Sequence, residues 1–95
     1  MGIQGIEKRQ IQGNRMGRSK YKDGIELYRL YYDAHPSSSR AAYNLGRACT
    51  EDGRNDLAIR YLKESLRLLP EDRSVSAFSR RFIQRSATRL LDDLT

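Results

Sequence analysis

The sequence lacks the disulfide bonds with which many small proteins reinforce a small core, and it has no apolar stretch long enough to enter a membrane. It holds one cysteine among 95 residues, so no disulfide within the chain can staple it. No apolar run approaches the roughly 18 residues that a membrane-spanning helix requires, and the first residues lack the apolar stretch of a secretory signal. A chain of this length forms one small domain and is too short for a barrel enzyme of roughly 200 residues. We therefore expect no membrane contact and a cytoplasmic location.

Residues typical of catalytic and metal sites are equally scarce. His35 is the only histidine, and it falls at a predicted helix end, where a cation is mildly favourable. Cys49 lies on the inner face of a predicted helix and is interpreted as a small core residue, because no motif links it to His35. The acidic pairs at 51–52, 71–72 and 92–93 fall at helix ends or turns and are interpreted as solvated surface. No phosphate-binding loop, dinucleotide fingerprint or zinc motif occurs, so we expect no enzyme, no cofactor and no metal.

The net charge of +6 raises the question of nucleic-acid binding, and its distribution bears on the answer. Residues 1–20 carry +4 and residues 73–95 carry +3. Residues 21–38 carry −1, and residues 39–72 are neutral. The positive charge therefore lies on the two ends of the chain, and its centre gives no electrostatic reason to bind a polyanion.

The chain repeats itself with a period of 34 residues. Pro36 and Pro70 are 34 residues apart, and residues of matching type precede them. The matching pairs are Ile25 with Ile59, Leu27 with Tyr61, Tyr28 with Leu62, Tyr32 with Leu66, and Gly24 with Ala58. Agreement at this many positions in a short window indicates an internal repeat, although only two copies are present.

Within each copy, apolar residues recur three to four positions apart, which predicts helices. The expected helices span residues 21–34, 39–52, 56–68 and 74–93, and no stretch favours a strand. Expected N-caps are a serine of Ser37–Ser39, Asp56 and Ser74, and Gly53 is the expected C′ residue of the second helix. The last helix is expected to bury an apolar stripe of Val75, Phe78, Phe82, Ile83, Ala87, Leu90, Leu91 and Leu94. Its expected polar side carries Arg80, Arg81, Arg85 and Arg89.

A 34-residue period of paired helices resembles the tetratricopeptide repeat. The copy at 39–72 carries the resemblance through Leu45-Gly46, Ala48, Gly53, Ala58 and Pro70, which match the family pattern. The small Gly46 and Ala58 stand where the two helices of a repeat approach most closely. Ala42, Cys49 and Ser65 depart from the pattern, because the family often has Trp, Tyr and Ala at these positions. The resemblance implies an all-α, antiparallel helix-turn-helix array of four helices.

The resemblance is uneven along the chain, and this divides it into two segments. It is strong over 21–72, whereas the last helix resembles a capping helix by analogy. Residues 1–20 are a basic segment with four glycines, which we expect to be disordered or a poorly matched first helix. Residues 21–95 form the expected helical domain. Because repeat arrays need about three units for a stable core, an apolar face around Tyr28, Tyr31 and Tyr32 should remain open at the N-terminal end. We expect residues 1–20 or another chain to cover it, as a homodimer or a contact with a larger domain.

In the tetratricopeptide repeat family, the first helices line a concave groove that receives a peptide. The resemblance implies that Arg40, Tyr43, Asn44, Arg47 and Glu51 face this groove. The asparagine can bond a ligand backbone, and the two arginines can pair with acidic groups; the alternative is that all five are ordinary polar surface. One branch of the family clamps a C-terminal carboxylate, but only Arg9 and Asn44 fit that pattern, so this ligand is not expected.

Two functions from different classes follow. The favoured hypothesis is a non-catalytic interaction or assembly module that binds a peptide or a partner helix through the groove or the tyrosine-rich end. The alternative is a basic nucleic-acid-binding protein that uses the C-terminal arginine face together with the basic N-terminal segment. That face consists of Arg80, Arg81, Arg85 and Arg89. The neutral centre and the ordinary need of a capping helix for a polar outer face favour the first hypothesis.

Overall fold

The computed structural model describes residues 20–95, and this part of the chain is helical throughout. Its elements are α1 (Lys20–Ala34), α2 (Ser39–Glu51), α3 (Asn55–Leu68), the short 3-10 helix η2 (Leu69–Glu71) and α4 (Ala77–Leu94). No strand occurs between residues 20 and 95, so the all-α prediction is confirmed, with helix bounds that agree to within a few residues. The expectation for the N-terminal segment concerns residues that, apart from Lys20, lie outside the described part.

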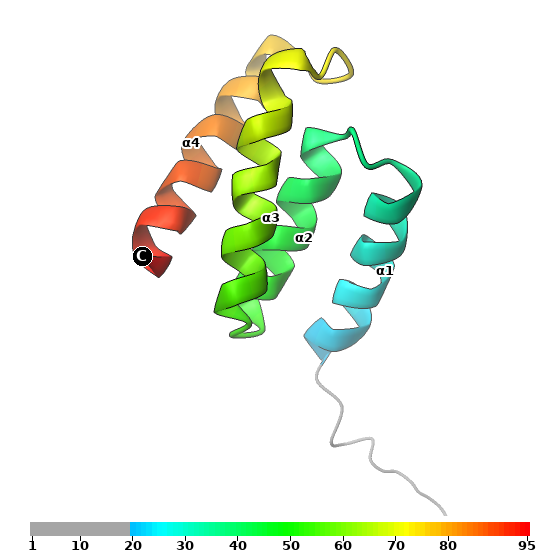
Figure 1. Ribbon diagram of the computed structural model, residues 1–95, viewed down its shortest axis with the longest axis vertical. Coiled ribbons are helices and arrows are strands. Elements are labelled where there is room, and N and C mark those ends of the chain that lie inside the picture. The colour runs from blue at the N-terminus through cyan, green and yellow to red at the C-terminus, as the bar shows by residue number, and fades with distance from the viewer. Residues whose placement is uncertain (1–19) are drawn as a thin grey trace, which may run out of the picture.

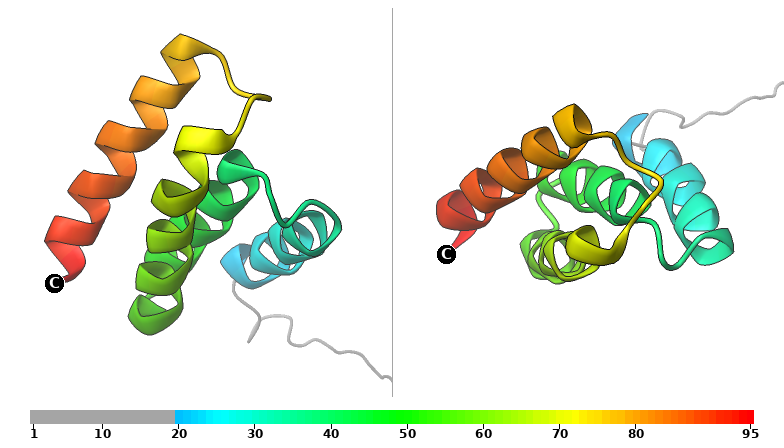
Figure 2. Two further views of the ribbon diagram at one scale, coloured as in Figure 1. Left: turned by 45° about the horizontal axis from the view of Figure 1, so that its top comes forward. Right: turned by 90° about the horizontal axis from the view of Figure 1, so that it is seen from above.

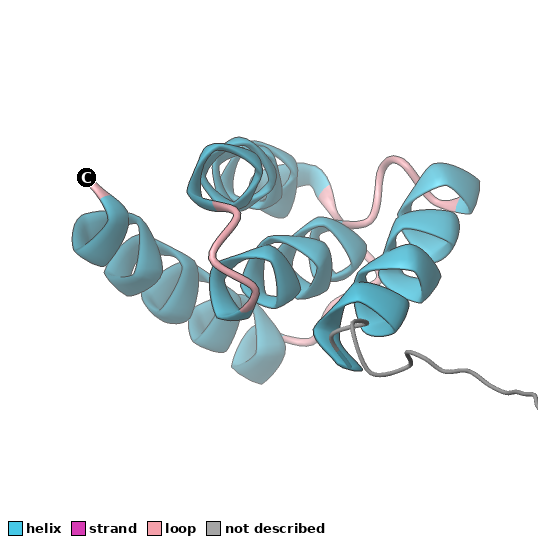
Figure 3. Ribbon diagram, turned by 90° about the horizontal axis from the view of Figure 1, so that it is seen from below, coloured by secondary structure: helices cyan, strands magenta, loops and turns pink. Residues whose placement is uncertain are grey.

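Helices that follow one another in sequence also lie side by side in space (Figure 1). α2 and α3 form an antiparallel pair, α1 packs against α2, and α4 packs mainly against α3. In the two further views, α1 and α4 lie on opposite sides of this central pair (Figure 2). Short loops join the helices, as the colouring by secondary structure shows (Figure 3). Because α4 returns antiparallel to α3, it runs in the same direction as α2.

The turn residues explain where the central helices begin and end. The Ser38 side chain accepts a hydrogen bond from the N–H of Ala41 at 3.1 Å and caps α2. Gly53 has a φ of 75°, a conformation that side chains disfavour, which confirms its role after α2. Two predicted caps are wrong. Asp56 lies inside the first turn of α3, because that helix begins at Asn55. Ser76 rather than Ser74 caps α4, with its side chain accepting from the N–H of Ser79.

Close approach of α2 and α3 depends on the absence of a side chain at Gly46. A Cβ placed there would lie 2.8 Å from Cγ of Leu62, which is inside van der Waals contact. Ala58 and Leu62 are fully buried at the same interface. The prediction that small residues allow this pair of helices to pack tightly is confirmed.

Two hydrophobic clusters hold the described part of the chain together. One joins α2 and α3 to α4 through Tyr43, Leu62, Leu69, Val75, Ile83 and Ala87. The other joins the central pair to α1 through Ile25, Leu45, Ala48, Cys49 and Ala58. Cys49 is buried as predicted, and burial raises the pKa of its thiol, so the protonated thiol packs as a small apolar group.

Asp72 corrects the prediction that the acidic pair at 71–72 is solvated surface. Its side chain is buried and accepts four hydrogen bonds. The N–H and the hydroxyl of Ser39 both donate to Oδ2 at 2.7 Å. The N–H and the hydroxyl of Ser74 donate to Oδ1 at 3.0 and 2.6 Å. Burial opposes ionisation of Asp72, but the bonds from Ser39 and Ser74 outweigh it and hold its pKa well below the usual range. The carboxylate thereby ties the start of α2 to the loop that follows η2.

Arg80 also has a structural role that its sequence position does not indicate. Its guanidinium donates to the backbone carbonyls of Leu69 and Asp72, and so braces the connection between α3 and α4. Arg80 is therefore half-buried and does not lie with the other arginines on an open polar face.

The predicted apolar stripe of α4 is correct in part. Val75, Ile83 and Ala87 are buried, with Leu90, Leu91 and Leu94 packed around them. Phe78 and Phe82 were expected in this stripe, but they are 77% and 52% exposed. Phe78 and Phe82 are exposed because they belong to a second stripe of α4, formed by residues 78, 82, 85 and 89. This stripe lies on the side of the helix that carries Arg85 and Arg89.

Candidate functional site

α2 and α4 run side by side and together form a surface, which we call the α2–α4 face. It consists of Arg40, Tyr43 and Asn44 from α2 with Phe78, Ser79, Arg81, Phe82 and Arg85 from α4.

Polar contacts join the two helices along this face. Nη2 of Arg40 donates to Oγ of Ser79 at 3.1 Å near the start of both helices. One turn further along α2 and two turns further along α4, the hydroxyls of Tyr43 and Ser86 are hydrogen-bonded at 2.5 Å. Hydrogen bonds between side chains of α2 and α4 therefore connect the two helices at this face.

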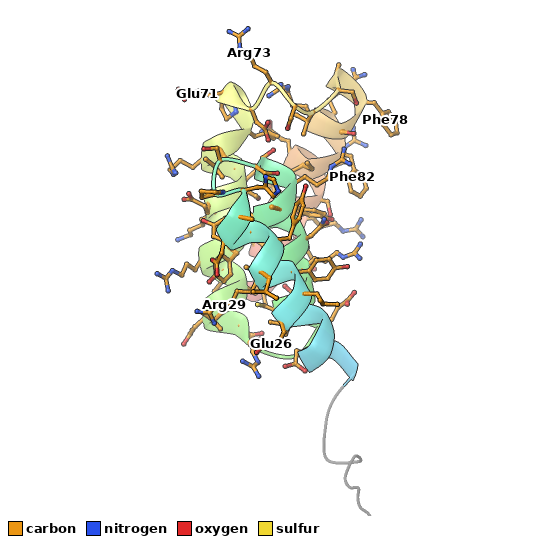
Figure 4. The ribbon with its side chains drawn as sticks, turned by 90° about the vertical axis from the view of Figure 1, so that its right-hand side faces the viewer. Glu26, Arg29, Glu71, Arg73, Phe78 and Phe82 are labelled. Carbon is orange, nitrogen blue, oxygen red and sulfur yellow. The ribbon has the colours of Figure 1, made fainter. Side chains whose placement is uncertain are left out.

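Two neighbouring hollows occupy the face. The first is about 280 Å³ and is lined by Arg40, Tyr43, Asn44, Ser79, Phe82 and Ile83. The second is about 240 Å³ and is lined by Phe78, Arg81, Phe82 and Arg85. Phe82 belongs to both, and its ring meets the Tyr43 ring edge-on with centroids 5.9 Å apart. In the side view, Phe78 and Phe82 project from α4 on the same side (Figure 4).

The five α2 residues expected to face a groove take different positions. Arg40 and Asn44 line the first hollow, whereas Arg47 and Glu51 are exposed further along the helix. Tyr43 is 4% exposed, and its hydroxyl is hydrogen-bonded to Ser86. Its ring therefore forms a wall of the hollow, and its hydroxyl is already engaged within the protein. The α2 side of the face thus presents one guanidinium and one amide beside an aromatic wall.

The α4 residues of the face were not assigned to it from the sequence. Phe78 and Phe82 were placed in the core, and Arg81 and Arg85 were placed on a separate arginine surface. The available signal was the i, i+4 spacing of the two phenylalanines, out of register with the stripe of Ile83, Ala87 and the leucines. Only the packing of α4 shows which of the two stripes is buried.

Of the four arginines expected to form a nucleic-acid-binding surface, one does not lie on that surface. Arg80 is committed to backbone carbonyls, so Arg81, Arg85 and Arg89 remain exposed. Two of these three border the hollow around Phe78 and Phe82.

The tyrosine-rich end also differs from the expectation. Tyr32 is half-buried, and its ring packs edge-on against Tyr61 with centroids 5.5 Å apart. Tyr28 and Tyr31 are exposed, and the Tyr31 ring packs at a tilt against the His35 ring with centroids 4.6 Å apart. Leu27 and Leu30, which were not singled out, are among the most exposed apolar residues. We call the exposed surface of Leu27, Leu30 and Tyr31 the α1 face.

Two further observations concern other kinds of site. Among the described side chains, no group of His, Cys, Asp and Glu is placed to hold a metal ion. Within residues 20–95, no helix has the length and apolar character needed to cross a membrane.

A comparison with protein families decides the assignment of this array. A family model described as "Tetratricopeptide repeat" matches residues 10–71. The chain belongs to the tetratricopeptide repeat family. The match covers α1, α2 and α3 and begins inside the N-terminal segment that aligned poorly by period alone. No curated protein and no solved structure gives a match to this chain. Tetratricopeptide repeats generally form non-catalytic scaffolds and mediate protein–protein interactions.

Proposed function

We propose that this tetratricopeptide repeat protein is a non-catalytic interaction module that binds a peptide or a helix of a partner protein on the α2–α4 face. The observation that carries the proposal is the hollow between Arg40, Asn44 and Phe82. A side-chain amide can bond the backbone of a bound segment, a guanidinium can pair with a carboxylate, and an exposed aromatic ring can cover an apolar side chain. These are the contacts from which peptide-binding sites are built.

A larger hollow on another part of the described surface is a weaker candidate. It measures about 490 Å³, but it is lined by the five consecutive residues 53–57 on the turn between α2 and α3. A site made from one turn brings together no side chains from different elements. The α2–α4 face combines residues from two helices, which supports its choice as the binding surface.

We further propose that the α1 face makes a second protein contact, as a homodimer or with a larger domain. Leu27 and Leu30 are 68% and 64% exposed on this surface. Helix faces that expose several large apolar side chains mark interaction surfaces when nothing covers them. The expectation that residues 1–20 cover this surface concerns residues that, apart from Lys20, lie outside the described part.

The binding role is tested by selecting peptides from a displayed random library against the full chain. Peptides that bind the α2–α4 face should lose about tenfold or more in affinity when Arg40 and Asn44 are both replaced by alanine. The matched control is Lys63→Ala, an exposed position on α3. If every selected peptide binds the double variant as tightly as the unchanged protein, the α2–α4 face is not the site.

A further inference from the structure

We propose that the ligand of the α2–α4 face is an acidic peptide segment that carries one large apolar side chain. The apolar side chain seats against Phe78 and Phe82, and carboxylates on either side pair with Arg81 and Arg85. This inference rests on the proposed peptide-binding function and names the chemistry of its ligand.

The two phenylalanines provide the apolar part of the argument. Phe78 and Phe82 lie one helical turn apart and point to the same side of α4 (Figure 4). Phe82 contacts the Tyr43 ring edge-on, whereas about half of its own surface is exposed to water. A ring pair of this kind, with a hollow of about 240 Å³ beside it, fits one aromatic or branched aliphatic side chain.

The charges around the hollows provide the second part. Three arginines line the two hollows, namely Arg40, Arg81 and Arg85, and no carboxylate does. Within the described residues, neither Arg81 nor Arg85 forms an ion pair. A surface with unmatched guanidinium groups attracts carboxylates, which they bind through two parallel hydrogen bonds.

Two arginines on other surfaces do have carboxylate partners within the described residues. On α3, Arg67 donates to both oxygens of Glu64, at 2.9 and 2.6 Å. After α2, Arg54 pairs with Asp52 at 2.9 Å. Within residues 20–95, carboxylates of the chain pair with these two arginines, whereas no ion pair forms at the arginines of the α2–α4 face. The missing partners are therefore expected on the ligand.

The far end of the same face favours a peptide over a nucleic acid. Because α2 and α4 run in the same direction, their C-terminal ends lie toward the same end of the molecule (Figure 1). Glu51 ends α2, and Asp92 and Asp93 lie in the last turn of α4, all exposed. A nucleic-acid strand that followed the face would carry phosphates past these carboxylates and be repelled. A short acidic segment confined to the arginine end avoids them.

The test measures fluorescence anisotropy of labelled synthetic probes with the full chain. One peptide places a Phe-Leu pair between runs of Glu and Asp, the second replaces every acid with its amide, and the third replaces the Phe-Leu pair with serines. A labelled single-stranded thymidine oligonucleotide is the fourth probe. The first peptide should bind about tenfold or more tightly than each of the other peptides, and its affinity should fall as salt rises.

Variants assign the effect to the proposed residues. Phe78→Ser and the double change of Arg81 and Arg85 to alanine should each weaken the first peptide about tenfold. The matched controls are Arg60→Ala and Lys63→Ala, both exposed on α3 and away from the face, and they should leave its affinity unchanged.

The outcomes distinguish a failure of the acidic-ligand inference from a failure of the proposed peptide-binding function. If the amide peptide binds as tightly as the acidic one and the Phe78→Ser variant weakens both, peptide binding stands and the acidic chemistry is overturned. If the oligonucleotide binds most tightly and loses affinity in the arginine double variant, the face binds nucleic acid and the inference is overturned. If none of the three peptides binds, whereas a peptide selected from the library binds the α2–α4 face, the inference is overturned and the proposed function stands.

Discussion

α1 and α4 flank the same central pair of helices, yet they are held by different chemistry. α1 packs through apolar contacts, with Ile25 buried and Tyr32 against Tyr61. α4 adds a set of polar anchors, in which Asp72 fixes its connecting loop, Arg80 clamps that loop's carbonyls, and Ser86 bonds Tyr43. Buried polar bonds fix one geometry because displaced donors and acceptors lose their partners. α4 is therefore the helix suited to carry a precise binding surface.

The two helices also differ in what they expose. The α1 face is apolar, with leucines and a tyrosine, which fits a flat contact with another apolar surface. α4 exposes two phenylalanines among unpaired arginines, which fits a ligand that is both apolar and acidic. One molecule thus presents two surfaces of distinct chemistry, one on α1 and one along α2 and α4, and the predictions below test whether they behave independently.

The largest effect is expected from removing the buried anchor of α4. Asp72→Ala leaves the N–H groups and hydroxyls of Ser39 and Ser74 without their acceptor. We expect a loss of about 2 to 3 kcal/mol in the free energy of unfolding, measured by chemical denaturation. Hydrogen exchange should rise more in α4 than in α1, because repeat arrays transmit stability through neighbours.

Glu71→Ala is the matched control, since Glu71 is exposed beside Asp72 and should change stability by less than about 0.5 kcal/mol. Equal exchange rates in α1 and α4 of the Asp72→Ala variant would contradict the separate anchoring of the two helices.

A smaller effect is expected from acid. The folded pKa of Asp72 lies below its unfolded value of about 3.9, so its contribution to stability is complete above that pH. As pH falls below about 4, the unfolded state takes up a proton before the folded state does, and this contribution is progressively lost. Unfolding free energies measured by denaturant at neutral pH and near pH 3 should differ more for the unchanged protein than for Asp72→Asn. An identical pH dependence in the two proteins would mean that Asp72 is not the group responsible.

The smallest effect on stability is expected at the α1 face. Leu30→Ser combined with Tyr31→Ser should alter the free energy of unfolding of the monomer by less than about 1 kcal/mol, because both side chains are exposed. Sedimentation of the full chain over a range of concentrations should show self-association that this double change abolishes. Phe78→Ser serves as the control and should leave self-association intact. A chain that stays monomeric at all concentrations would rule out the homodimer.

Local sequence information predicted the repeat, the helices and the close packing of α2 on α3. These features are recorded in the spacing of residue types along one repeat, as with Gly53 just after α2 and the small residues Gly46 and Ala58 in its two helices. The candidate site was predicted in part, since Arg40 and Asn44 follow from their helix position. Its α4 half was missed because Phe78 and Phe82 look like core residues until the neighbouring helix shows which side of α4 is covered.

The sequence by itself determined an all-α tetratricopeptide repeat with its turns and its neutral centre, because helix periodicity and repeat spacing are recorded along the chain. Tertiary structure alone decided the roles of Asp72 and Arg80. Ser39 lies 33 residues before Asp72, whose carboxylate accepts its hydrogen bonds. No local sequence pattern predicts a partner at that distance. The same holds for the α2–α4 face, which exists only where two parallel helices that are not consecutive come together.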